Sequence, residues 1–140
     1  MSHAVAEPFL EISFEDYLTI DTGEGRLEWV AGRVHAMSGG TERHNLIISE
    51  ISDVFRDGAR ARGCRRTRAR GCRRFIQGRR LRTDTASYYP DVFLVCGPAG
   101  ADQYETDASL VVEVLSPSTQ DVDRREKPIS YRRLPRSSAI

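Results

Sequence analysis

Long apolar runs are absent from this chain of 140 residues. No segment approaches the roughly 20 apolar residues that a membrane-spanning helix needs. The N-terminus also lacks the basic and then apolar pattern of a secretory signal. A chain of this length forms one domain with a modest core. We therefore expect a soluble, single-domain protein of the cytoplasm.

Cysteine is also scarce. Cys64, Cys72 and Cys96 are an odd number at unrelated spacings, and the chain contains no C-x-x-C pair. This pattern argues against a zinc site and against a disulfide framework. Because Cys96 ends an apolar segment, we interpret it as a small core residue.

Lysine is limited to one residue, whereas arginine is abundant and unevenly placed. Residues 56 to 82 contain 12 arginines and one acid, which is a local charge of +11 against −10 for the rest of the chain. An arginine block beside an acidic body suits a phosphate-binding arm. No aromatic platform interleaves with these arginines. A solvated stretch that pairs in part with the acidic body is therefore an equally good interpretation.

Local signals predict helices and a hairpin in the first half of the chain. Ser13, with Asp16 three residues later, has the pattern of a capped helix start. The dipeptide Ala31-Gly32 between two apolar segments indicates a hairpin turn. Apolar residues at helical spacing predict a second helix that ends near Gly63. The predicted elements are a disordered lead-in at 1–12, a helix at 13–18, a hairpin at 26–37 and a helix at 44–62.

The second half is expected to contain strands followed by a charged helix. A turn at Gly78 predicts a hairpin between the two arginine-rich segments that flank it. The further predicted elements are strands at 88–96 and 110–115, a connecting loop at 97–107 and a helix at 119–134. This order favours an α/β or α+β fold, with a mixed sheet and helices packed on it, in one domain over residues 13–140.

Each of the two late strands carries one acid among apolar residues. These acids are Asp91 and Glu113. A carboxylate in such surroundings costs several kcal/mol unless a cation compensates it. Two carboxylates on neighbouring strands would repel each other unless they share a metal ion. With Lys127, the only lysine, they form a set typical of metal-dependent phosphodiester cleavage.

Each candidate also has a structural interpretation. Asp91 follows a proline, so it could begin a strand on a turn. Glu113 could face solvent from an edge strand, and Glu28 could point outward from the hairpin. Lys127 stands in a highly charged segment. His44 begins a helix, where capping the helix is as plausible as approaching a phosphate.

Several segments resemble one known family. They are RLEWVAG at 26–32, SGGTERHN at 38–45, YPDV at 89–92, VEVLSPST at 112–119, and DRREK at 123–127 with Tyr131. In this order they are similar to the bacterial Uma-type restriction endonucleases of the PD-(D/E)XK nuclease superfamily. The likeness covers residues 13 to about 135. It implies a restriction-endonuclease-like mixed sheet flanked by helices, a Mg²⁺ or Mn²⁺ site and a DNA substrate.

The resemblance also implies roles for individual residues. Asp91 and Glu113 would bind the metal, with the Val114 backbone carbonyl as a further ligand. Lys127 would replace the motif lysine from a position on the following helix. Glu28 would be a second metal ligand or would orient the attacking water. His44 would contact the metal ligands without binding the metal itself, or it would bind a phosphate.

The resemblance further implies the partners of the chain. The DNA contacts expected from the arginine block are Arg65, Arg66, Arg68 and Arg70. A homodimer is expected by analogy with superfamily members that cut both strands.

The chain departs from the family pattern in two places. The family continues after the last helix with a further strand pair, whereas this chain stops at residue 140. We therefore expect a domain without its last strands and with an unpaired sheet edge. Pro128 directly follows Lys127, so the last helix is expected to begin near Glu126. The alternatives to an endonuclease are a catalytically silent nucleic-acid-binding remnant and a truncated product without function.

Overall fold

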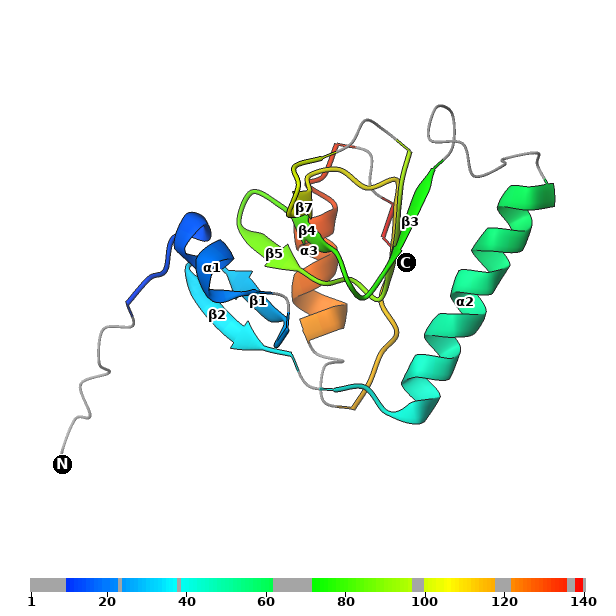
Figure 1. Ribbon diagram of the computed structural model, residues 1–140, viewed down its shortest axis with the longest axis horizontal. Helices are drawn as coiled ribbons and strands as arrows, with labels where there is room; N and C mark the ends of the chain where they lie inside the picture. The colour runs from blue at the N-terminus through cyan, green and yellow to red at the C-terminus, as the bar shows by residue number, and fades with distance from the viewer. Residues whose placement is uncertain are drawn as a thin grey trace.

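A computed structural model describes residues 10–22, 24–37, 39–61, 72–96, 100–117, 122–135 and 138–139. Within these residues the strands form two sheets and the helices pack beside them (Figure 1). The first sheet has the order β2-β1-β5-β4-β7 and the second β3-β6-β8-β9. The predicted mixed fold of helices and strands is confirmed as α+β. The strands, however, divide between two sheets and do not form one.

The bounds of the elements follow the chain order. The helices are α1 (Phe14–Ile20), α2 (Glu42–Ala61) and α3 (Lys127–Tyr131), and a π-helical turn at Val122–Glu126 precedes α3. The strands are β1 (Leu27–Val30), β2 (Arg33–Ala36), β3 (Arg73–Ile76), β4 (Arg80–Arg82), β5 (Ala86–Tyr88), β6 (Val92–Val95), β7 (Tyr104–Glu105), β8 (Leu110–Val112) and β9 (Ser138–Ala139).

The helix start and the hairpin of the first half form as predicted. The Ser13 hydroxyl accepts a 3.0 Å hydrogen bond from the Asp16 N–H and caps α1. The turn between β1 and β2 holds Ala31 at φ 47° and Gly32 at φ 82°, the left-handed pair that suits a tight hairpin. The N–H of Ile12 donates to the Gly32 carbonyl at 2.8 Å. The expectation of a disordered lead-in is therefore wrong at residue 12, and residues 1–9 lie outside the described part.

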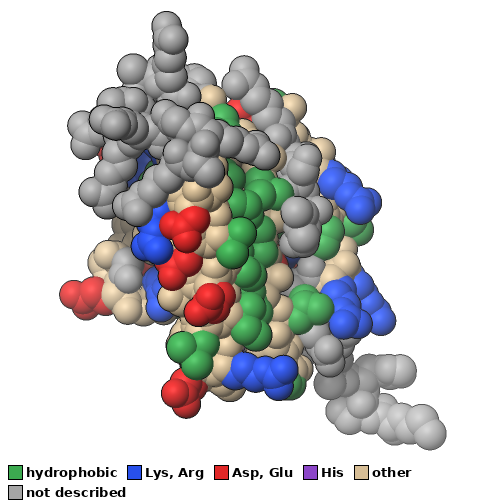
Figure 2. Space-filling model, turned by 90° about the vertical axis from the view of Figure 1, so that its right-hand side faces the viewer, with side chains coloured by type: hydrophobic (Ala, Val, Ile, Leu, Met, Phe, Trp, Pro, Cys, Tyr) green, Lys and Arg blue, Asp and Glu red, His purple; other side chains and the backbone are tan. Residues whose placement is uncertain are grey.

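Helix α2 confirms the prediction of a long helix, but only part of its apolar pattern faces the core. Ile48 is buried at 2% exposure against Val92 and Val112 of the second sheet. Leu46 and Val54 are 58% and 69% exposed. Figure 2 shows hydrophobic side chains running along this outer face of the molecule. The predicted end of the helix at Gly63 lies outside the described residues.

The predicted hairpin at Gly78 is wrong. Strand β3 pairs with β6 in the second sheet, whereas β4 pairs with β5 and β7 in the first. The chain changes sheet at Gln77, which has a left-handed φ of 50° and donates its N–H to the Asp91 carbonyl at 3.2 Å. Pairing with β6 also lets the ring of Phe75 pack on Phe93, with centroids 5.1 Å apart. The long-range partner wins because it buries apolar surface that a local hairpin would leave exposed.

The main core lies between the two sheets and includes α3. Its members are Leu81, Ala86, Tyr88, Phe93, Val95, Ala108, Val111, Tyr131 and Leu134. The loop predicted at 97–107 contains the short strand β7, which pairs in parallel with β4. Among the described helices, none is both long and apolar enough to cross a membrane.

The interpretation of the cysteines is wrong in two respects. Cys72 and Cys96 form a disulfide, and both are exposed. The cause is the antiparallel register of β3 and β6, in which Arg73 faces Val95 and the next positions outward are the two cysteines. The register depends on long-range pairing, so cysteine spacing alone could not reveal it. Cys64 lies outside the described residues.

The last part of the chain differs from its predicted single helix. The π-helical turn and α3 occupy only part of the segment 119–134, and Pro128 stands in the first turn of α3 with Glu126 at its N-cap. A proline there costs no hydrogen bond, which agrees with the expected start near Glu126. Strand β9 then pairs in parallel with β8. That edge of β8 is therefore paired, and β9 becomes the edge strand of the second sheet.

Candidate active site

The two carboxylates meet because of the register between β6 and β8. Val92 faces Val112 as the last antiparallel pair. Asp91 precedes β6 and Glu113 follows β8, so both lie just beyond this pair at one end of the sheet. The Asp91 N–H donates to Glu113 Oε2 at 3.4 Å, and the Val114 N–H donates to Asp91 Oδ2 at 2.7 Å. Asp91 stands at the bend that leads into β6, as expected for a residue that begins a strand, but it is buried, with 7% exposure.

Lys127 reaches this pair of acids from the first turn of α3. Its Nζ lies 3.4 Å from Glu113 Oε1 and 3.4 Å from Glu28 Oε1. It also lies 5.3 Å from the centre of the Tyr88 ring, within the range of a cation–π contact. The residue is only 6% exposed, so its charge is compensated inside the protein. Lys127 is therefore not part of a solvated charged face.

Glu28 joins the site from the first sheet. Its Oε1 accepts a hydrogen bond from the Tyr89 N–H at 3.2 Å and contacts Lys127. The side chain is 13% exposed, so the interpretation as an outward-facing hairpin residue is wrong. Glu28 thereby connects the lysine to the backbone two residues before Asp91.

Tyr131 is a site residue for which the sequence suggested no role. Its hydroxyl donates a 2.6 Å hydrogen bond to Glu113 Oε1. Burial, the Glu113 charge and this hydrogen bond raise the pKa of Tyr131 well above its usual value, so the phenol remains a donor. A helical signal was present, because Tyr131 follows Lys127 by four residues and so shares its helix face.

His44 lies behind the two acids, near the start of α2. Its Nε2 is 2.9 Å from the Val114 carbonyl oxygen and 3.4 Å from Asp91 Oδ2. Both neighbours are acceptors, so Nε2 carries the proton. Within the described residues the buried Nδ1 has no hydrogen-bond partner. A Cβ on Gly40 would come within 2.7 Å of Nδ1, so a glycine at this position leaves room for the ring.

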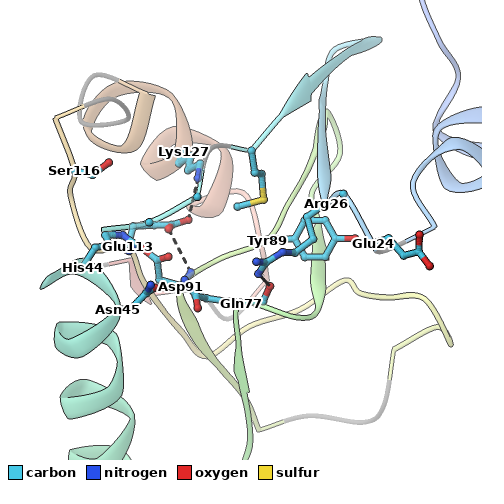
Figure 3. A pocket seen from close by; sticks show the side chains of 14 residues that line it. Glu24, Arg26, His44, Asn45, Gln77, Tyr89, Asp91, Glu113, Ser116 and Lys127 are labelled. Carbon is cyan, nitrogen blue, oxygen red and sulfur yellow. Dashed lines mark hydrogen bonds and ion pairs between the residues drawn. The ribbon is translucent and has the colours of Figure 1, made fainter. Parts of the chain in front are cut away.

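A cavity of about 540 Å³ opens over these groups (Figure 3). Its lining includes Asp91, Glu113 and Lys127 together with His44. The remaining lining residues are Glu24, Gly25, Arg26, Met37, Gly39, Gly40, Asn45, Gln77, Tyr89 and Ser116. The acids thus lie in a hollow where a substrate and water have access. Arg26 and Gln77 were not recognised as candidates from the sequence.

The donor atoms fit Mg²⁺ or Mn²⁺ better than zinc. No cluster of three or more His, Cys, Asp or Glu side chains in the described part of the chain is arranged to hold a metal. Mg²⁺ needs no such cage, because it keeps several waters and uses one or two carboxylates. Asp91 and Glu113 supply that pair of hard oxygen ligands. The Val114 carbonyl, expected as a further ligand, is in contact with His44.

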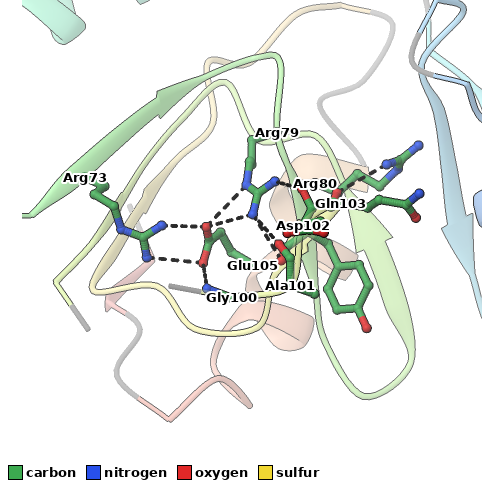
Figure 4. A network of polar contacts seen from close by, with 9 residues as sticks. Arg73, Arg79, Arg80, Gly100, Ala101, Asp102, Gln103 and Glu105 are labelled. Atoms are coloured by element: carbon green, nitrogen blue, oxygen red, sulfur yellow. Dashed lines mark hydrogen bonds and ion pairs between the residues drawn. The ribbon is translucent and has the colours of Figure 1, made fainter. Parts of the chain in front are cut away.

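The described arginines of the basic block mostly bind acids and backbone of the protein itself. Glu105 is 1% exposed, and its Oε1 forms ion pairs with Arg73 Nη1 at 2.8 Å and Arg79 Nη2 at 3.0 Å (Figure 4). Burial raises the pKa of Glu105, but the two arginines and the Gly100 N–H outweigh it and lower that pKa below its usual value. Pairing with the acidic body is thus the correct interpretation here. Arg65, Arg66, Arg68 and Arg70 lie outside the described residues.

Comparisons with known proteins show the family and the fold of the chain. The family model Uma2, described as "Putative restriction endonuclease", matches residues 14–136. An uncharacterized Synechocystis protein is 30% identical over 131 residues, which cover 91% of this chain and 65% of that protein. The crystal structure of a putative nuclease from Anabaena variabilis superposes with a TM-score of 0.63 at 19% identity, covering 86% of this chain and 65% of that one. The chain thus spans about two thirds of the length of either relative, and it belongs to the Uma2 family of putative restriction endonucleases.

Proposed function

We propose that this protein is a divalent-metal-dependent endonuclease that hydrolyses phosphodiester bonds of DNA. The observation that carries the proposal is the meeting of Asp91, Glu113 and Lys127 at one cavity from three separate segments. A buried ammonium that contacts two carboxylates, beside a third carboxylate, is costly to maintain unless it serves a purpose. The family membership supports a nuclease on independent grounds.

The metal-binding part of the proposal assigns Asp91, Glu113 and the Val114 carbonyl as ligands for Mg²⁺ or Mn²⁺. When bound there, such an ion supplies Lewis acidity toward a phosphoryl oxygen and lowers the pKa of a water. Tyr131 orients Glu113 by binding Oε1, and the Val114 N–H holds Asp91 Oδ2.

The remaining residues supply charge and position. Lys127 acts as a catalytic residue whose ammonium stabilises negative charge that develops on the phosphate. Glu28 acts as a positioning residue, because it holds that ammonium and is itself fixed by the Tyr89 N–H. His44 keeps Asp91 and the Val114 carbonyl in place through its Nε2 proton.

The wider setting follows from the same proposal. Arg65, Arg66, Arg68 and Arg70 would bind the DNA backbone, and a homodimer would cut both strands. The cytoplasm is the compartment where we expect the enzyme to meet DNA. The folded unit is expected to be one domain over residues 13–140.

A plasmid-cleavage assay tests the proposal. The parent should nick or linearise supercoiled DNA in Mg²⁺ or Mn²⁺ and not in chelator. Asp91→Ala and Glu113→Gln should each abolish cleavage. Asp84→Ala is the matched control, since within the described residues this exposed carboxylate pairs only with the surface residue Arg133, and it lines no part of the cavity.

Thermal melts of the same proteins test the metal site without relying on turnover. Mn²⁺ should raise the melting temperature of the parent and of Asp84→Ala but not of Asp91→Ala, because a ligand that binds only the folded state stabilises it. DNA binding without a metal response or cleavage would support the catalytically silent remnant instead. The lack of any cooperative melt would support the truncated product.

A further inference from the structure

We propose that Arg26 binds a backbone phosphate of the nucleic-acid strand next to the phosphate that is cut. The inference rests on the proposed nuclease function and adds a substrate contact to it. Arg26 immediately precedes β1 and lines the same cavity as Asp91 and Glu113. Figure 3 shows it beside Gln77 at the edge of that cavity.

Arg26 and Lys127, two cations of the lining, differ in the groups that they contact. Lys127 contacts two carboxylates and is buried. Arg26 makes no ion pair with any carboxylate in the described part of the chain, and its one side-chain contact there is a 2.7 Å hydrogen bond from Nη1 to the Gln77 carbonyl. A guanidinium carries five N–H donors in a planar fork. Most of them therefore remain available to an oxyanion in the cavity.

The position of this guanidinium is tied to the candidate metal ligands. Gln77 accepts the Arg26 hydrogen bond through its carbonyl and donates its N–H to the Asp91 carbonyl at 3.2 Å. One residue thus connects Arg26 to Asp91 by two hydrogen bonds. Both Arg26 and Gln77 have left-handed backbones, with φ of 41° and 50°. Non-glycine residues keep that costly conformation mainly where the surroundings require it, often at functional sites.

The chemistry of the ligand follows from the donor. A planar arginine fork suits two oxygens of one phosphate, whereas an ammonium acts as a point charge. The acid Glu24 also lines the cavity, and its negative charge repels a small free anion. A nucleic-acid strand tolerates this repulsion better, because it is held at several points. The expected ligand is therefore a phosphodiester of a bound strand, and the contact carries no base specificity.

Fluorescence anisotropy with a labelled DNA duplex in chelator tests this contact, because binding is then measured without cleavage. Arg26→Gln should weaken binding about tenfold or more, the effect of losing hydrogen bonds to a charged group. It should also reduce the slope of log K against log salt by about 0.9, the value for one phosphate contact. Arg133→Gln is the matched control, because it removes an equal charge from an exposed arginine that pairs with Asp84.

A second variant separates a phosphate contact from a structural role of the hydrogen bond to Gln77. Arg26→Lys keeps the charge but not the fork, so it should retain the salt slope while affinity falls. A thermal melt checks that each variant is folded. Equal binding and equal slopes for Arg26→Gln, Arg133→Gln and the parent would overturn the proposal. So would a loss of affinity in Arg26→Gln with an unchanged slope, since the residue would then act only on the fold.

The outcomes also distinguish this proposal from the proposed function. A parent that binds DNA through Arg26 but never cuts with metal would refute the endonuclease and leave the phosphate contact standing. A parent that cuts, with Arg26→Gln binding as the parent does, would refute only the contact. Repeating the titration with an RNA duplex of the same sequence shows whether the bound phosphodiester can belong to RNA as well as DNA.

Discussion

The hydroxyl of Tyr131 donates a 2.6 Å hydrogen bond to Oε1 of Glu113, the same oxygen that lies 3.4 Å from Lys127 Nζ. One carboxylate oxygen is thus engaged by two donors from α3. The other, Oε2, lies 3.4 Å from the Asp91 N–H. The last helix therefore sets the orientation of an acid that belongs to a different part of the chain.

Tyr131→Phe should weaken the metal site while preserving the fold. The ring still fills the core, but a hydrogen bond to a charged group, about 1.5–3 kcal/mol, is lost. We expect cleavage to fall roughly tenfold and the Mn²⁺-induced rise in melting temperature to shrink. A loss of stability with an unchanged Mn²⁺ response would mean that Tyr131 is only a core residue.

Gly40→Ala should disturb His44 and thereby the acids. The new Cβ would lie 2.7 Å from Nδ1, so the ring must move away from Asp91 and the Val114 carbonyl. We expect reduced cleavage in the plasmid assay. Gly39→Ala is a close control, because its Cβ would meet nothing within 4 Å although Gly39 lines the same cavity. Equal activity of the two variants would show that the ring position is unimportant.

Lys127→Met should destabilise the protein in the absence of metal. Removing one partner of a buried ion pair costs about 3–5 kcal/mol, since Glu28 and Glu113 would both lose the ammonium that they contact. Urea titrations measure this loss. Added Mn²⁺ should restore part of it by supplying positive charge, and cleavage should stay low. An unchanged unfolding free energy in chelator would contradict the compensation of these acids by Lys127.

Glu105 should make the free energy of unfolding depend on pH in the acidic range. Its pKa is lowered in the folded state, so its contribution is complete above the unfolded pKa of about 4.5 and is lost as pH falls through the folded value. Glu105→Gln should reduce the free energy of unfolding by about 3 kcal/mol at pH 7, because Arg73 and Arg79 lose a buried carboxylate that both contact.

The pH dependence of that difference gives the check. Urea titrations between pH 7 and pH 3 should show the gap between parent and Glu105→Gln closing in acid. The exposed pair of Asp84 and Arg133 serves as the comparison, since Asp84→Asn should change little at any pH. A constant gap would contradict a lowered pKa for Glu105.

Local sequence signals were enough to predict three backbone features. The cap at Ser13, the left-handed turn at Ala31-Gly32 and the start of α3 beside Pro128 each depend on backbone preferences within a few residues. Asp91 and Glu113 could be recognised as candidate site residues from local sequence as well, since a charge inside an apolar segment needs compensation wherever the segment lies. The family resemblance placed Lys127 and Glu28 near these acids.

The contacts between distant segments became visible only in the three-dimensional structure. The register of β6 against β8 places Asp91 beside Glu113, and the register of β3 against β6 joins Cys72 to Cys96. Neither register has a local signature, because strand pairing is selected by the total burial of both partners and not by either sequence alone. The link from Arg26 through Gln77 to Asp91 has the same origin. This link exists because the chain passes from one sheet to the other at Gln77. No spacing of residues in the sequence predicts that change of sheet.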